Sequence, residues 1–176
     1  MWGYGLSYSL AEPTIIDKVL HGEVKLNYKN IKVKEEESWR LASELVKNLA
    51  NYDIEIIDDV YPVIIVYLNK FLIIIVPLGK KLSVTGELSL EIFQKIFDII
   101  KKIRNNKKIV MIYFSPGGKL LLSAYLFLGY LIEKHDVGIL FVNGGIDEVL
   151  EVIEKLAKKG SFAPEEEDYV DLKAIG

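Results

Sequence analysis

The sequence predicts an α/β fold with three layers, in which helices cover both faces of a central mixed sheet. The first observation is that 176 residues, 51% of them hydrophobic, are enough for one domain with a sizeable core. The second is a set of β-branched apolar runs with almost no polar residue, which is typical of strands buried on both faces. The third is that strand-like and helical segments alternate between about 71 and 159, an order that predicts parallel strands joined by right-handed helical crossovers.

The N-terminal part is predicted to add a helix and a hairpin. Residues 1–34 carry little periodic signal beyond a short helix at 15–20 and a hairpin that turns at 29–30. From about 35 to 51, apolar residues recur three and four positions apart, which predicts an amphipathic helix.

Three strand-like segments follow this helix, at 53–60, 63–68 and 71–78. Only Asn69 and Lys70 separate the second segment from the third, and a two-residue connection predicts an antiparallel hairpin. Pro77 is expected at the end of the third strand, because proline cannot donate a hydrogen bond to a neighbouring strand.

The alternating part continues to about residue 159. Ser89 is the predicted N-cap of its first helix, since a serine side chain accepts a hydrogen bond from a free helix N–H. Residues 1–160 are predicted to form one domain, and the acidic segment 161–176 is predicted to be a solvated, flexible tail. The remaining elements are helix 89–105, strand 108–114, helix 119–134, strand 137–142 and helix 146–159.

The composition excludes several kinds of chemistry. The chain has no cysteine, so it has no disulfide, no thiolate nucleophile and no cysteine-based zinc site. A formal charge of -3 gives no general electrostatic reason for nucleic-acid binding, although basic patches at 101–102 and 107–108 leave that partner open. The abundance of isoleucine, lysine and glutamate is typical of archaeal and other hyperthermophilic proteins.

The sequence carries no evident targeting or membrane segment. Residues 1–10 lack the basic start and continuous apolar core of a signal peptide. The charge-free run at 120–132 is shorter than the roughly twenty residues that span a bilayer. We therefore expect a cytoplasmic protein without a membrane span.

Two glycine turns are the candidate ligand site. Each follows a predicted parallel strand, and ligands of α/β sheets bind outside the carboxyl ends of such strands. If the two strands are neighbours, the turns form one crevice that suits an anionic small molecule or a nucleotide. The alternative is that glycine serves only the tight turn, because neither turn matches a known phosphate-binding fingerprint. The candidate ligand-binding residues are Ser115, Gly117, Gly118, Lys119, Asn143, Gly144 and Gly145.

The stretch 86–118, followed by an apolar helix and "VGILFVNGG", resembles the core of the Clp protease and signal-peptide-peptidase group within the crotonase superfamily. In that group a Ser-Pro-Gly-Gly turn helps to form the oxyanion hole, so the resemblance implies this role for Gly117 and Gly118. The implied nucleophile is missing, because "NGGIDEVLE" contains no serine or threonine. No histidine follows His135, so the implied general base is missing as well.

Two other families resemble parts of the chain. Gly117, Gly118 and Lys119 resemble the loop that holds cyclic oligoadenylate in CRISPR-associated Rossmann-like sensor domains, although the threonine of that loop is missing. The order of elements from 35 to 114 resembles restriction-endonuclease-like nucleases. Those enzymes bind metal through carboxylates within their strands, whereas here the nearest are Asp58 and Asp59, just before strand 63–68. We therefore predict no metal site, no cofactor and no catalytic residue.

The predicted helix 119–134 has apolar residues on both faces. A helix on one side of a sheet normally keeps a polar stripe outward, so its outer face is expected to be covered by the N-terminal segment or by another chain. Tyr113, Tyr125 and Tyr130 could instead stack on bases, but tyrosine more often packs in a core or an interface. The predicted interface residues are Leu121, Tyr125, Leu128 and Tyr130.

These features favour a non-catalytic interaction module, a degenerate relative of an enzyme fold that works as a homo-oligomer or as a complex subunit. Two alternatives stay open. One is a binding domain for an anionic small molecule or nucleotide at the glycine turns, and the other is a hydrolase or nuclease whose site the sequence does not reveal.

Overall fold

The computed structural model describes residues 35–57, 62–103, 107–135 and 137–158. Their core is a five-stranded mixed sheet with the strand order β1-β2-β3-β5-β7. The elements along the chain are α3 (Glu35–Asn48), β1 (Asp53–Ile57), β2 (Val63–Tyr67), β3 (Phe71–Pro77), β4 (Ser83–Val84), α4 (Gly86–Ile103), β5 (Lys108–Phe114), β6 (Lys119–Leu120), α5 (Leu122–His135), β7 (Val137–Val142) and α6 (Ile146–Lys158).

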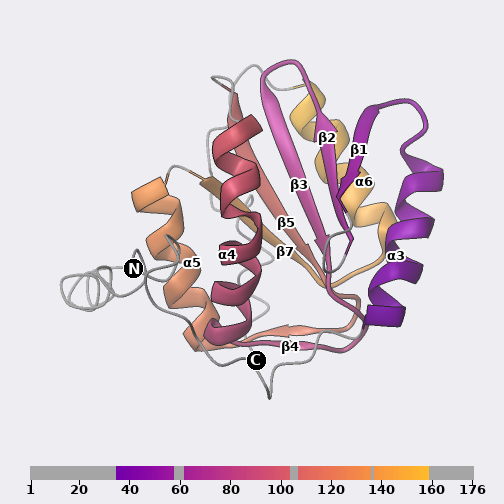
Figure 1. Cartoon of the computed structure of the whole chain (residues 1–176). Helices are drawn as coiled ribbons and strands as arrows, with labels where there is room; N and C mark the ends of the chain where they lie inside the picture. Colours follow the sequence, from indigo (N-terminus) through magenta and orange to yellow (C-terminus); the bar gives the residue numbers. More distant parts are fainter. Residues whose placement is uncertain (1–34, 58–61, 104–106, 136, 159–176) are drawn as a thin grey trace.

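The sheet has an antiparallel half and a parallel half. β1 pairs with β2, and β2 with β3, in antiparallel register. β3, β5 and β7 are parallel, and the helices between them run back to the start of the next strand (Figure 1). The carboxyl ends of the three parallel strands therefore lie at one edge of the sheet and their amino ends at the other.

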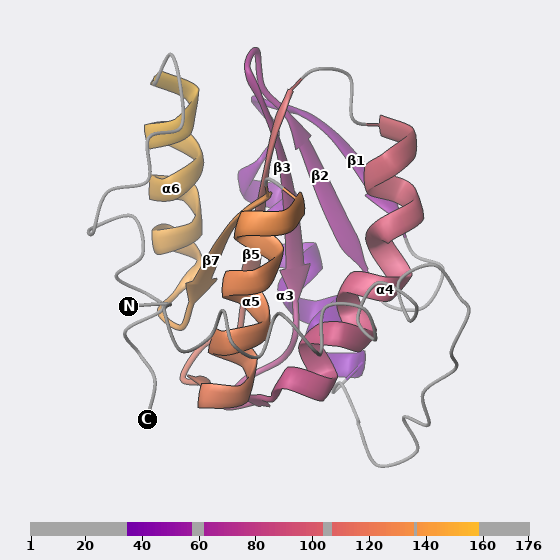
Figure 2. The ribbon, with the colours of Figure 1, turned by 90° about the vertical axis from the view of Figure 1, so that its left-hand side faces the viewer.

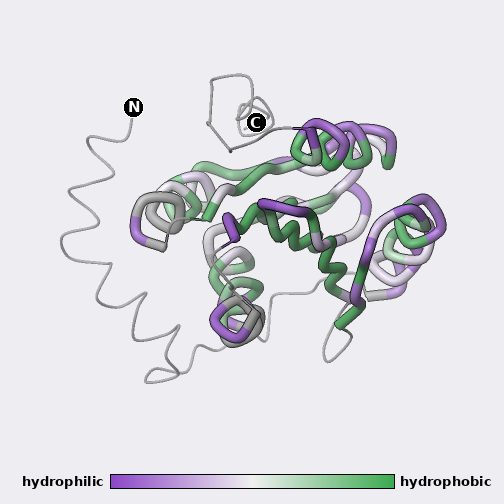
Figure 3. The backbone as a smooth tube through the Cα atoms, turned by 90° about the horizontal axis from the view of Figure 1, so that it is seen from above, coloured by the Kyte–Doolittle hydropathy of each residue, from purple (hydrophilic) through white to green (hydrophobic). Residues whose placement is uncertain are grey.

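Helices cover both faces of the sheet, as the apolar strands require. Figure 2 shows α4 and α5 on one face and α3 and α6 on the other. The strands between them are drawn mainly in the hydrophobic colour in Figure 3. Two crossovers that step in the same direction along a sheet place their helices on the same face, which explains the position of α4 beside α5. The large buried side chains include Phe93 and Tyr113 on this face and Phe71 and Phe114 on the other.

The structure confirms the predicted three-layer α/β fold, the antiparallel hairpin and the parallel part. The helix boundaries differ. α4 begins at Gly86, because Thr85 and not Ser89 is its N-cap: the Leu88 N–H donates to the Thr85 hydroxyl at 3.1 Å. α5 begins at Leu122 and not at Lys119, because β6 pairs with β4 in a small parallel ladder. α3 ends at Asn48, before the predicted 51.

Several predictions concern residues outside the described part of the chain. They are the helix at 15–20, the hairpin that turns at 29–30, the carboxylates of Asp58 and Asp59, and the acidic tail at 161–176. Within the described residues, none of the helices combines the length and apolar character that crossing a membrane requires.

Candidate functional site at the carboxyl ends of the parallel strands

The two glycine turns lie side by side. β5 and β7 are neighbours, and the chain leaves β5 toward α5 on one face and β7 toward α6 on the other. Adjacent strands whose connections diverge to opposite faces create the crevice in which α/β proteins bind ligands. The structure therefore brings the predicted site residues together at the place where a ligand is expected.

Hydrogen bonds within the protein occupy every backbone N–H of the Ser115–Lys119 turn; Pro116 has none to offer. A ligand anion usually binds such a turn through free N–H groups. Here these groups donate to carbonyl oxygens, so an anion would have to displace a hydrogen bond to reach them. The bonds run from Ser115 to Val142 (3.0 Å), from Gly117 to Asn143 (2.7 Å), from Gly118 to Ser115 (2.9 Å) and from Lys119 to Leu82 (3.0 Å).

The Ser115 side chain joins this turn to the segment that follows β3. It is fully buried, and its Oγ donates to the Gly79 carbonyl at 2.7 Å and accepts from the Leu82 N–H at 3.3 Å. The Lys81 N–H donates to the Pro116 carbonyl at 2.8 Å. We name residues 79–82 and 115–119 together the corner, because side-chain and backbone hydrogen bonds hold them as one structure.

The 79–82 segment is a part of the site that the sequence analysis missed. Gly79 has a φ of 122° and Lys81 a φ of 55°, values that L side chains rarely adopt. A glycine directly after a strand was the available signal, but its partner, Ser115, is 36 positions away.

Only glycine fits at position 118, because the backbone there has no space for a side chain. A Cβ there would lie 2.6 Å from the Leu82 carbonyl oxygen and would overlap the Ser115 side chain. Gly117 has a φ of 71°, which favours glycine for its backbone conformation. Both glycines of the SPGGK turn thus have a structural reason within the corner itself.

The second turn also makes internal contacts. The Asn143 side-chain amide donates to the Gly118 carbonyl at 3.5 Å, and the Glu148 carboxylate packs where a Cβ of Gly144 would lie. Asp147 and Glu148 place acidic side chains in the first turn of α6, where a carboxylate complements the helix dipole. The negative charges of these acids repel a ligand anion at the start of α6. Gly145 faces open space.

Exposed lysines are the ligand-binding groups that remain. Lys80, Lys81 and Lys119 are all exposed around the corner, and the Lys80 N–H donates to the Glu37 carboxylate at 2.7 Å. Within the described ranges, no group of three or more histidine, aspartate or glutamate side chains is arranged to hold a metal ion. The ammonium groups of these lysines are the cations that a ligand anion would meet here, whereas the N–H groups of the Ser115–Lys119 turn are already occupied.

The predicted interface residues on α5 and directly before it differ in burial. Leu121 and Tyr125 are half-buried, and Leu128 is fully buried in the core, so Leu128 is not an outward residue. The side chain of Tyr130 lies outside the described part. The prediction missed Leu122, which is 57% exposed, and its half-buried neighbour on the next turn, Leu126.

Tyr113 is not available to stack on a base. It is fully buried, and its hydroxyl donates to the Ser89 carbonyl at 3.5 Å. Burial raises the pKa of Tyr113, so the hydroxyl stays neutral.

No protein-family model matches the chain, and no curated protein or solved structure matches it either. The resemblances to crotonase-like peptidases, CRISPR-associated sensors and nucleases therefore stay predictions from the sequence.

Proposed function

We propose that the chain is a non-catalytic interaction module that associates with a second copy of itself through α5. The observation that carries the proposal is the exposure of Leu122 on a helix whose sequence has no polar stripe. Leu122 and Leu126 are four positions apart and so lie on one side of the helix. Burying these leucines against the same face of a second copy would remove apolar surface from water without burying a charge.

The internal hydrogen bonds of the corner support the non-catalytic part of this proposal. An oxyanion hole needs N–H groups that point at the reacting oxygen, whereas those of Gly117 and Gly118 donate to protein carbonyls. The crotonase-like resemblance would then reflect a shared turn that serves packing in this chain.

Sedimentation velocity over a range of protein concentrations tests the proposal. We expect a dimer or larger oligomer for the natural chain and a monomer for the double variant Leu122→Glu, Leu126→Glu. Ile56→Glu is the matched control, because Ile56 is 46% exposed on β1, away from α5, and should leave the oligomer unchanged. A natural chain that stays monomeric at every concentration would overturn self-association.

Binding of a small anion at the corner is the second candidate, favoured by the exposure of Lys81 and Lys119 beside the turn. Thermal melting with a panel of nucleotides tests it. A bound nucleotide should raise the melting temperature, and Lys119→Ala should reduce that rise. No change with any nucleotide would exclude this candidate for the panel used.

A further inference from the structure

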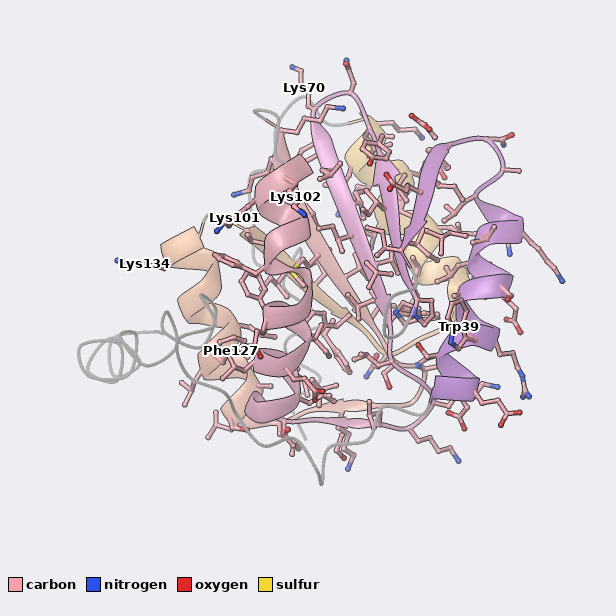
Figure 4. All side chains as sticks on the ribbon, viewed as in Figure 1. Trp39, Lys70, Lys101, Lys102, Phe127 and Lys134 are labelled. Carbon is pink, nitrogen blue, oxygen red and sulfur yellow. The ribbon has the colours of Figure 1, made fainter. Side chains whose placement is uncertain are left out.

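Lysines gather at the amino ends of the parallel strands, the edge opposite the corner. Three features of the fold bring them there: the hairpin between β2 and β3, the start of β5, and the last turns of α4 and α5, which run antiparallel to the strands. We name this set the lysine edge. It consists of Lys70, Lys101, Lys102, Lys107, Lys108 and Lys134, and Figure 4 labels four of these residues on one side of the molecule.

Backbone pairing places the strand lysines close together. The Lys108 N–H donates to the Lys70 carbonyl at 3.2 Å, and Lys108 is paired with Phe71 in the sheet. Lys107 is more fixed, since its ammonium donates to the Leu68 carbonyl at 2.8 Å and lies 6.0 Å from the centre of the Tyr67 ring.

The helix lysines extend the edge over the α4 and α5 face. Lys101, Lys102 and Lys134 are exposed, as is Lys70 on the hairpin. The Lys101 ammonium lies 5.1 Å above the Phe97 ring, which holds the charge at the surface of α4. The lysine edge therefore includes the hairpin and the ends of two helices.

Helix dipoles explain only part of this distribution. Lysines in the last turn of a helix complement its negative end, which accounts for those on α4 and α5. The lysines at 70, 107 and 108 lie on a hairpin and before or at the start of a strand, where no such dipole acts. The opposite edge mixes its lysines with Glu36, Glu37, Asp147 and Glu148.

Among the acids whose side chains the structure describes, two groups border the lysine edge: one on β1, and Glu154 in the last turns of α6, where its carboxylate accepts a hydrogen bond of 2.9 Å from the Lys158 ammonium. Asp53 and Glu55 are on the outermost strand, β1, and the Glu55 carboxylate accepts a hydrogen bond of 2.6 Å from the Tyr67 hydroxyl. A chain with a formal charge of -3 thus carries a locally positive edge, and a local field of this kind attracts polyanions in spite of the net charge.

We propose that the lysine edge binds the phosphate backbone of a nucleic acid, without reading its sequence. Ammonium groups neutralise phosphates as compact point charges and release bound counterions, a sequence-independent contribution. A membrane surface would also favour exposed apolar side chains beside the lysines. The large hydrophobic side chains that are exposed in the described part are Trp39, Ile56 and Leu122. Trp39 lies away from this edge in Figure 4, Leu122 is at the opposite end of α5 from Lys134, and Ile56 is near the end of β1 that is farther from Tyr67.

Fluorescence anisotropy tests the proposal with two labelled probes of equal length and mixed sequence, a DNA duplex and a single-stranded RNA. The natural chain should bind at low salt, and the logarithm of its affinity should fall linearly with the logarithm of the salt concentration. The variant Lys70→Gln, Lys101→Gln, Lys102→Gln should bind at least about tenfold more weakly, with a salt slope lower by about three.

The opposite edge offers a control with the same change of charge. The variant Lys80→Gln, Lys81→Gln, Lys119→Gln should bind at least about fivefold more tightly than the lysine-edge variant, because its charges are far from the lysine edge. Equal loss in both variants would show that only net charge matters, and it would overturn the proposal.

Two further outcomes would also overturn it: no binding of either probe at low salt, or binding to anionic phospholipid vesicles without binding to nucleic acid. The substituted lysines are exposed, so the melting temperature should not change. If the variant Lys70→Gln, Lys101→Gln, Lys102→Gln does not fold, the salt dependence of the natural chain tests the proposal instead. A slope near zero would contradict phosphate contacts.

Discussion

The two ends of the parallel strands differ in what occupies their loops. At the carboxyl ends, the corner uses its backbone N–H groups, a buried serine and tightly placed glycines for internal hydrogen bonds and packing. At the amino ends, a hairpin, a strand start and two helix ends carry lysines, four of which are exposed: Lys70, Lys101, Lys102 and Lys134. The corner thus shows that residues resembling a ligand-binding motif can serve stability. The lysine edge matches no motif, yet it carries the charge that a partner would meet.

The largest expected effect comes from Gly118→Ala. The new Cβ would meet the Leu82 carbonyl and the Ser115 side chain, so we expect the free energy of unfolding to fall by about 2 to 3 kcal/mol. Gly145→Ala in the neighbouring turn has open space and should change it by less than about 0.5 kcal/mol. Denaturant-induced unfolding measures both. Equal, small effects would contradict the tight packing of the corner.

A smaller loss is expected from Ser115→Ala. The variant leaves the Gly79 carbonyl and the Leu82 N–H without their buried partner, at a cost of about 1 to 2 kcal/mol. Hydrogen exchange at the Leu82 amide should become faster. Ser83→Ala is the control, because Ser83 is exposed on β4 and should be neutral. An unchanged exchange rate at the Leu82 amide would show that the Ser115 hydroxyl does not stabilise the corner through this N–H.

The smallest effect is expected at the amino ends, at Tyr67. The hydrogen bond to the Glu55 carboxylate, with help from burial, raises the pKa of Tyr67 from 10.0 to about 12. The folded state keeps the Tyr67 proton to a higher pH than the unfolded state does. The resulting contribution to the free energy of unfolding is therefore complete below pH 10 and is lost as the pH rises to about 12. The ring is partly exposed, so the loss should be only about 0.5 kcal/mol.

Carbon NMR of labelled tyrosine measures this titration directly. Tyr67→Phe should remove the resonance that titrates near pH 12, and Glu55→Gln should move its pKa back toward 10. A Tyr67 that titrates near pH 10 in the natural chain would show that the bond to Glu55 is weak, as expected of a solvent-facing edge.

The sequence was sufficient for the layers and the order of the elements. β2 and β3 are buried runs of β-branched residues, and a two-residue turn admits only an antiparallel pairing. α4 was predicted from its helical spacing of apolar residues, because this local signal is also the packing pattern.

The sequence was insufficient where distant segments decide the outcome. Thr85 and Ser89 are both good N-caps, and the choice between them follows from the pairing of β4 with β6. The role of the 79–82 segment depends on Ser115, and the lysine edge joins residues from four separate elements or loops. No local pattern reports such contacts, although each residue involved was visible in the sequence.

The corner also has a consequence for the rates of folding and unfolding. Its hydrogen bonds join residues 36 positions apart, and they lie beyond the last pair of the β3–β5 ladder, Pro77 with Phe114. Closing so distant a contact becomes favourable only after the ladder has formed, so the corner is expected to form late. Interactions that form after the transition state slow unfolding and leave the folding rate almost unchanged. The Ser-Pro-Gly-Gly turn would then lower the unfolding rate and so lengthen the lifetime of the folded state.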